Sequence, residues 1–155
     1  MDQPERLLGA AHTLIAAGAP VVFVQHGEGA GAPFETGTPH WRLHASFDVR
    51  EGDAVVHKEQ SSAFDGTELH QRLQQLGAGE LVVCGLQSEF CVSNTTKSAL
   101  ALGYAVRLAQ DGHGTWPSEG KTADTISAEV NQDLRSRGAT LSSTAELADR
   151  LRQAG

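Results

Sequence analysis

The sequence predicts an α/β fold of three layers, in which a mostly parallel sheet lies between layers of helices. Two observations predict it. Short runs that are apolar throughout alternate along the chain with longer segments whose apolar residues recur at helical spacing. A strand that is apolar on both faces has to be covered on both, as in parallel sheets flanked by helices. Because the sequence shows neither a linker nor an internal repeat, residues 1–155 are expected to form one domain.

The elements are expected in a regular order. The first is a helix that begins near Pro4 and ends before Gly18. Apolar runs predict strands at 21–24, 54–56, 81–84, 104–109 and 139–141, and amphipathic patterns predict helices at 69–76, 92–102, 123–137 and after 143. Ser143 and Glu146 form a capping box, which is typical of a helix N-terminus. The loop between 26 and 53 is long for a compact domain, and its aromatic residues predict an ordered lid.

The composition argues against several classes of function. Lys and Arg number 12 against 19 Asp and Glu, so the formal charge is −7, which argues against a nucleic-acid partner. No apolar run approaches the roughly 20 residues needed to cross a bilayer, so no membrane span is expected. The N-terminus MDQPER is polar and has no apolar core segment, so no signal peptide is expected. Two cysteines do not suggest a disulfide framework, so a reducing, cytoplasmic location is expected.

The segment GLQSEFCV, residues 85–92, brings a cysteine to the point where a strand ends and a helix begins. Ligand sites of parallel sheets lie beyond the carboxyl ends of the strands, and Cys91 and Lys58 both lie at such ends. Helix N-terminal N–H groups and a nearby cation favour the thiolate, the nucleophilic form of cysteine. This pattern indicates acyl transfer through a thioester, with backbone N–H groups binding the oxyanion. The alternative is that Cys91 is a small packing residue and Lys58 a solvated lysine.

Several segments in order resemble the isochorismatase-like cysteine hydrolases, the family that includes nicotinamidases and related amidases. They are PVVFVQHGEG, GTPHWRLH, AVVHKEQSSAFDGTELHQRL and LVVCGLQSEFCVSNTTKSALALGYAVRLAQDGHGTW, and the resemblance extends from Pro20 to about Leu147. It implies a Rossmann-like sheet of strand order 3-2-1-4-5-6. Since true isochorismatases of the family cleave a vinyl ether and can lack the cysteine, the cysteine favours the amidase branch. The expected reaction is cleavage of a C–N bond in a small-molecule amide.

The resemblance also assigns roles to individual residues. It implies that Cys91 is the nucleophile and Lys58 its charged partner. It implies a cis peptide bond between Leu86 and Gln87, and an oxyanion hole formed by the N–H groups of Gln87 and Cys91. Trp41, which is also compatible with an ordinary place in the core, is a candidate substrate contact.

Two further residues are candidate substrate contacts. Phe64 could line the pocket or belong to the core, and His26 follows the strand at 21–24 as a possible pocket wall. In nicotinamidases the region after this strand supplies an Asp and two His to a metal. The segment QHGEGAG lacks that pattern, so neither a metal nor a cofactor is expected. Cys84, within an apolar strand, is expected to be inert. The resemblance implies a homo-oligomer.

One part of the family pattern has no counterpart in this chain. The family's first strand ends in a catalytic Asp, within an apolar run followed by Asp-x-Gln, whereas Asp2 follows no strand. Three explanations are open: a longer native protein, a truncated and inactive relative, or another segment that fills the same place. Because the Asp takes the thiol proton, catalysis is expected to be impaired. The alternative function is a catalytically inactive family member with a binding or assembly role.

Overall fold

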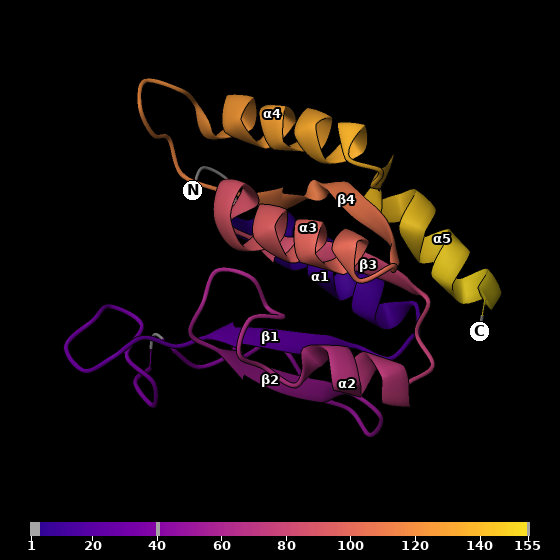
Figure 1. The fold of residues 1–155 in the computed structure, drawn as a ribbon, viewed down its shortest axis with the longest axis horizontal. Helices are drawn as coiled ribbons and strands as arrows, with labels where there is room; N and C mark the ends of the chain where they lie inside the picture. Colours follow the sequence, from indigo (N-terminus) through magenta and orange to yellow (C-terminus); the bar gives the residue numbers. More distant parts are fainter. Residues whose placement is uncertain (1–3, 40, 155) are drawn as a thin grey trace.

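The strands form two parallel sheets in the computed structural model, which describes residues 4–39 and 41–154 (Figure 1). β1 (Val22–His26) pairs with β2 (Ala54–Lys58). β3 (Glu80–Leu86), β4 (Ala105–Gly114) and β5 (Thr140–Ser142) form the second sheet in the order β3-β4-β5. The predicted α/β class is therefore confirmed. The sequence β2-β1 and then β3-β4-β5 is the expected family order without its first strand.

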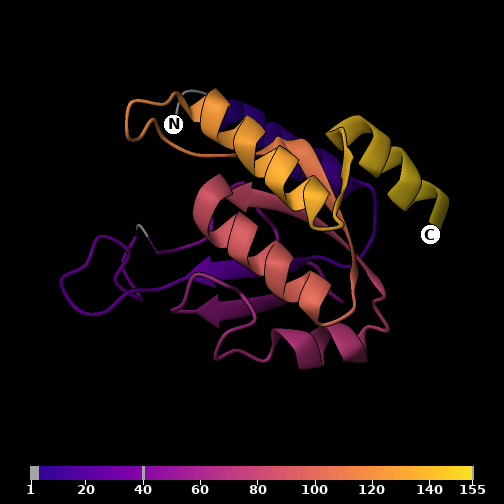
Figure 2. The same cartoon turned by 45° about the horizontal axis from the view of Figure 1, so that its top comes forward.

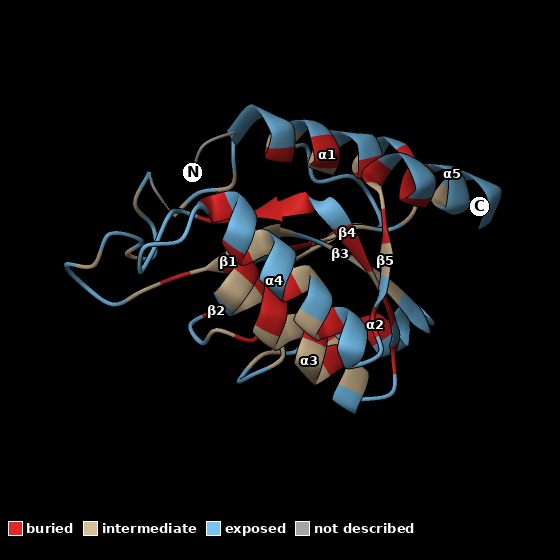
Figure 3. Ribbon diagram, turned by 90° about the horizontal axis from the view of Figure 1, so that it is seen from above, coloured by how far each residue is buried: buried red, intermediate tan, exposed pale blue. Residues whose placement is uncertain are grey.

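Helices cover both faces of this arrangement (Figure 3). α1 (Pro4–Ala16) and α5 (Thr144–Ala154) lie together on one face, and α3 (Ser93–Ala101) and α4 (Ala123–Ser136) lie on the other with α2 (Leu69–Gln75). The predicted helices are thus all present, which gives the three layers that the alternating pattern requires.

Buried side chains hold the layers together. Beneath α3 and α4, Leu108 of β4 and Leu134 of α4 are fully buried in one cluster, and burial of a leucine stabilises a fold by about 1.5–3 kcal/mol. Leu14 of α1 and Leu147 of α5 form a second cluster on the opposite face. At the start of α5, the N–H of Glu146 donates to Ser143 Oγ over 3.1 Å, so the predicted N-cap role of Ser143 is confirmed, which is one of the two hydrogen bonds of a capping box.

A third cluster connects the two sheets. It joins Val56 of β2 and Leu73 of α2 to Ala99 of α3 and Val106 of β4. The β1–β2 sheet and α2 are therefore held to the rest of the molecule by apolar packing on the α2–α3 face.

Among the residues that the structure describes, β1 and β3 each have a ladder on one side only. β1 lies on the side of its sheet nearer to β3, yet the two strands are not hydrogen-bonded to each other (Figures 1 and 2). Val24 is 38% exposed and Leu86 is 43% exposed, and Cys84 is also exposed. The expectation that the strand at 81–84 is buried is therefore wrong, because an edge strand lacks the cover of a second neighbour.

β4 continues five residues beyond its predicted end at Ala109. Its pairing with β3 is interrupted between Val83 and Gly85, and it then resumes with Gly85 opposite His113. The pattern did not predict this second stretch because the residues from Gln110 to Gly114 are polar or glycine.

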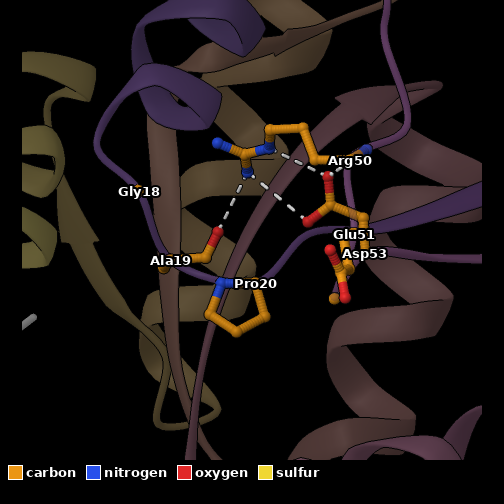
Figure 4. Close-up of a pocket in the computed structure, with 7 residues that line it drawn as sticks. Gly18, Ala19, Pro20, Arg50, Glu51 and Asp53 are labelled. Carbon is orange, nitrogen blue, oxygen red and sulfur yellow. Dashed lines mark hydrogen bonds and ion pairs between the residues drawn. The ribbon is translucent and has the colours of Figure 1, made fainter.

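The amino ends of β1 and β2 meet at a pocket lined by Gly18 to Pro20 and Arg50 to Asp53 (Figure 4). The Arg50 guanidinium donates to Asp53, to the carbonyl of Ala19 and to the carbonyl of Ile15. Asp53 Oδ1 in turn accepts the N–H of Val21 over 2.9 Å. These contacts close the start of the β1–β2 ladder, so the residues of the pocket have a structural role.

Candidate active site

A thiol and an amine lie side by side at the carboxyl edge of the sheets. Cys91 Sγ and Lys58 Nζ are 3.2 Å apart, although the two residues are 33 positions apart in the chain. The Lys58 side chain is buried, with only 5% of its surface exposed. A buried ammonium group needs polar partners, and the carbonyl oxygens of Gln60 (2.7 Å) and Ser61 (3.2 Å) accept hydrogen bonds from it. The two residues that the sequence analysis named as catalytic are therefore in contact.

Lys58 is held in place by its strand and by the loop that follows. It is the last residue of β2, where the parallel register pairs it with His26. The loop after β2 is tied to α3 by three hydrogen bonds: Ser61 Oγ accepts from Asn94 Nδ2 (2.8 Å), the N–H of Ala63 donates to Thr95 Oγ1 (2.9 Å), and the hydroxyls of Ser62 and Ser98 share a bond (2.8 Å). Since this loop supplies two of the Lys58 acceptors, α3 determines where the ammonium group lies.

Cys91 is positioned by the turn between β3 and α3. Gly85 has a φ of 127°, which L side chains rarely adopt, and the peptide bond between Leu86 and Gln87 is cis. The chain then forms a single π-helical turn, η1 (Ser88–Val92), in which the N–H of Val92 donates to the carbonyl of Gln87 over 3.1 Å. Such turns occur frequently at functional sites. Cys91 thus lies within η1, two residues before α3 begins at Ser93, close to the helix start that the sequence analysis expected.

A buried hydrogen-bond network supports this turn from behind. Ser88 is fully buried, and its hydroxyl lies 2.7 Å from His113 Nδ1. His113 Nε2 lies 2.7 Å from Asn131 Oδ1, and Asn131 Nδ2 donates to the carbonyl of Gln110. Since the Asn131 oxygen only accepts, the ring proton is on Nε2 and Nδ1 accepts from Ser88. Burial lowers the pKa of His113 below its ordinary value of 6.5 and keeps the ring neutral, although the Asn131 hydrogen bond and Asp111 oppose the shift.

Sequence reasoning missed these supporting residues. His113 lies beyond the predicted end of its strand, in a run of polar and glycine residues that is typical of a loop, yet it is 1% exposed. The partners of each pair are far apart in the sequence, and nothing local marks them. One usable signal was the run SNTTKS at 93–98, where polar residues open a helix that packs against a site.

The three candidate substrate contacts lie in different surroundings. His26 Nδ1 is 3.1 Å from Lys58 Nζ, so this residue is part of the site. The Trp41 ring stacks on His57 at 5.3 Å, and its N–H is buried without a hydrogen-bond partner among the described residues. Phe64 packs in the core cluster of α2 and α3 and stacks on Tyr104 at 6.1 Å. A substrate contact of each residue stays a prediction.

Cys84 differs from Cys91 in its surroundings. Its side chain is accessible from the open edge of β3, yet enough protein surrounds the thiol that desolvation raises its pKa to about 11. A thiol with so high a pKa forms little thiolate near neutral pH.

The described residues contain neither a cluster that could hold a metal ion nor a helix that could span a membrane. Among residues 4–39 and 41–154, no group of three His, Cys, Asp or Glu side chains could hold a metal ion. Within the part of the chain that the structure describes, no helix is long and apolar enough to cross a bilayer. Asp2 lies outside the described residues.

The fold and site define a class: an α/β protein with a cysteine nucleophile candidate beside a buried lysine, at the carboxyl edge of parallel strands. Residues 2–146 match the isochorismatase domain. The chain belongs to the isochorismatase family, as the resemblance predicted.

Individual relatives agree with this assignment. The chain is 37% identical over 133 residues to streptothricin hydrolase of Streptomyces noursei, covering 84% of this chain and 47% of that protein. It is 31% identical over 67 residues to nicotinamidase 3 of Arabidopsis thaliana, which covers 43% of this chain and 34% of that protein. The chain therefore spans about half or less of the length of these curated relatives.

Solved structures have the same fold. A putative isochorismatase from Burkholderia xenovorans LB400 superposes with a TM-score of 0.84 at 32% identity, covering 96% of this chain and 74% of that one. An isochorismatase from Pseudomonas putida KT2440 gives a TM-score of 0.86 at 27% identity, covering 94% of this chain and 79% of that one.

Proposed function

We propose that this chain is a cysteine hydrolase that cleaves the C–N bond of a small-molecule amide through a thioester on Cys91. The observation that carries the proposal is the 3.2 Å contact between Cys91 Sγ and the buried Lys58 ammonium group. A cation at this distance stabilises a thiolate and the oxyanion that its attack creates. The names of two relatives, a streptothricin hydrolase and a nicotinamidase, support a hydrolase that acts on a small molecule.

The reaction would proceed in two stages. The Cys91 thiolate attacks the amide carbon, a C–S bond forms, and the carbonyl electrons move onto the oxygen. The N–H groups of Gln87 and Cys91 bind this oxyanion, and Lys58 provides positive charge nearby. The amine then leaves with a proton, and water hydrolyses the thioester to release the carboxylic acid and the free thiol.

The substrate pocket is proposed to include His26 and Trp41. His26 lies beside Lys58, and the buried Trp41 N–H, which has no partner among the described residues, is a donor that a polar atom of the substrate could satisfy.

A homo-oligomer and a cytoplasmic location stay predictions from the resemblance and the composition. One relative, from Verticillium dahliae, is named as a secreted effector.

We further propose that hydrolysis by the chain as given is slow. Among the described residues, no carboxylate forms an ion pair with Lys58, and none is hydrogen-bonded to Cys91. A carboxylate base that takes the thiol proton typically contributes a factor of about 10²–10⁴ to the rate. The alternative is an inactive family member that binds a ligand or a partner. The open edges of β1 and β3 favour this alternative, since unpaired strands can bind other chains.

The test compares this chain with a version extended at its N-terminus by an apolar strand that ends in Asp. Both are assayed on nicotinamide, other small amides and streptothricin. We expect slow turnover by the chain, faster turnover by the extended version, and none after Cys91→Ala in either. Wild-type turnover by Cys91→Ala would refute the thioester mechanism. If neither version hydrolyses any of these compounds, but the compounds raise the melting temperature of the protein, the binding alternative holds.

A further inference from the structure

The Lys58 ammonium group has more acceptors than protons. It carries three N–H bonds, and four atoms lie within hydrogen-bonding distance of Nζ: the carbonyls of Gln60 and Ser61, His26 Nδ1 and Cys91 Sγ. The two carbonyls can only accept. The thiol and the imidazole therefore compete for the remaining proton, and these are also the two groups that can exchange protons with the amine.

The neighbouring contacts determine which imidazole nitrogen faces the lysine. Since an ammonium group only donates, His26 Nδ1 is the acceptor over 3.1 Å and its ring proton is on Nε2. Nε2 lies 3.7 Å from Glu28 Oε1. The order of groups is therefore Cys91, Lys58, His26 and Glu28, from a partly buried thiol to a partly exposed carboxylate. The β1–β2 register fixes the central contact, because His26 and Lys58 are direct partners in the ladder.

We propose that His26 accepts the thiol proton of Cys91 through Lys58, and that Glu28 stabilises the imidazolium that results. This proposal rests on the proposed function. Lys58 passes one ammonium proton to His26 Nδ1, so that an Nζ–H bond breaks and an Nδ1–H bond forms. The Cys91 S–H bond then breaks and its proton moves to Nζ. The products are a thiolate, an ammonium group and an imidazolium, and the total charge of the three groups is unchanged.

The same path returns the proton when the amine leaves. Lys58 protonates the departing nitrogen, which breaks an Nζ–H bond and forms an N–H bond on the leaving amine, and the imidazolium then gives its Nδ1 proton to the neutral Lys58 amine. Glu89, two residues before Cys91 in the sequence, is hydrogen-bonded to another residue: its carboxylate accepts from Thr115 Oγ1 over 2.6 Å. Apart from Cys91, the described groups in contact with Lys58 Nζ are two carbonyls and the His26 imidazole, and of these the imidazole nitrogen is the one that can take up a proton and give it back.

A purely orienting role for His26 makes a different prediction, and His26→Asn separates the two. An Asn side chain retains an acceptor oxygen close to the place of Nδ1, so it can still orient Lys58, but it cannot take a proton. His26→Ala removes both properties. His44→Asn is the matched control, because His44 is an exposed histidine whose Nδ1 contacts Ser46.

The experiment measures the rate of iodoacetamide alkylation of Cys91, on a Cys84→Ala background so that a single thiol reacts. At neutral pH we expect His26→Asn and His26→Ala to lower the rate by roughly 10²-fold, the lower end of what a positioned proton acceptor contributes. Glu28→Gln is expected to lower it by about 2- to 5-fold, as for an exposed ion pair. His44→Asn should leave it unchanged. At a pH that ionises the thiol without help, all rates should converge. Thermal unfolding verifies that each variant is folded.

Two results of the alkylation experiment would overturn the proposal: a wild-type alkylation rate in His26→Asn, or a loss in His26→Asn that persists at high pH. The alkylation needs no substrate, so it separates this proposal from the proposed function. If no amide is hydrolysed but alkylation depends on His26 as described, the hydrolase assignment fails and the proton path stands. If amides are hydrolysed equally well by the wild type and His26→Asn, the proton path fails and the hydrolase assignment stands.

Discussion

Two buried charges lie at opposite ends of the β1–β2 ladder, and the protein compensates them in different ways. At the amino end, Asp53 accepts hydrogen bonds from the N–H groups of Val21 and Arg50 and forms an ion pair with the Arg50 guanidinium at 3.0 Å. At the carboxyl end, Lys58 has carbonyls, an imidazole and a thiol as partners. A carboxylate whose partners lower its pKa, as at Asp53, adds stability to the folded state, whereas an ammonium group without a paired carboxylate can stabilise negative charge that forms during a reaction.

The largest expected effect contrasts these two ends in activity. Lys58→Met keeps most of the side-chain volume but removes the charge, and we expect it to lower kcat/KM by at least about 10²-fold, as for the loss of one oxyanion-stabilising group. Asp53→Asn, at the other end of the same ladder, should leave kcat unchanged. Steady-state kinetics at a temperature where both variants are folded provide the measurement. Equal losses in the two variants would abolish the distinction between the ends.

The next effect concerns stability behind the nucleophile. His113→Ala empties a buried site, removes the partner of Asn131 Oδ1 and leaves the buried Ser88 hydroxyl with its bond to Ser127 alone, so we expect a loss of roughly 2–4 kcal/mol in the free energy of unfolding. Because burial lowers the pKa of His113, the stabilisation from its neutral ring is fully present above pH 6.5 and is lost as the pH falls through the lower folded-state pKa. Urea unfolding at several pH values measures both.

The control for that experiment is His44→Ala, which changes an exposed ring and should leave stability and its pH dependence as in the wild type. If His113→Ala lost stability on acidification as steeply as the wild type, His113 would not be the group responsible.

A smaller loss is expected at the amino end. Burial of Asp53 opposes its ionisation, but the Arg50 side chain and the two backbone N–H groups prevail and hold the pKa of Asp53 below its ordinary 3.8. Asp53→Asn should therefore cost about 1–3 kcal/mol near neutral pH, which lowers Tm by roughly 2–4 °C per kcal/mol. The wild-type advantage is present above pH 3.8 and disappears as the pH falls through the lower folded-state pKa. A difference in Tm between the wild type and Asp53→Asn that does not change with pH would contradict this.

The smallest effect is on the second thiol. Desolvation raises the pKa of Cys84 to about 11, so we expect iodoacetamide at neutral pH to label Cys91 and leave Cys84 largely unmodified, even though Cys84 is accessible. Peptide mapping after brief labelling makes the comparison. Cys84→Ala should change neither turnover nor Tm appreciably. Preferential labelling of Cys84 would reverse the assignment of the reactive cysteine.

The sequence predicted the order of the helices and strands because their apolar periodicity is a local property. It also predicted the contact between Cys91 and Lys58, because the carboxyl ends of parallel strands meet at one edge. It did not predict the exposure of Cys84, since the burial of a strand depends on its neighbours in the sheet. Nor did it predict the bond between Ser88 and His113, which joins residues 25 positions apart. Both depend on tertiary packing, which local patterns do not encode.

The open edges of β1 and β3 affect how the molecule fluctuates. The two sheets share no ladder, so each can act as a separate cooperative unit, and the apolar cluster around Val56 and Ala99 is the main connection between them. Lys58 belongs to one unit and Cys91 to the other. A partial opening that separates the units would therefore break the 3.2 Å contact while the hydrogen bonds within each sheet remain intact. Such a motion would separate the catalytic pair together with the hydrogen bonds that tie the loop after β2 to α3, so the lifetime of the pair is that of the docked state rather than that of the folded chain.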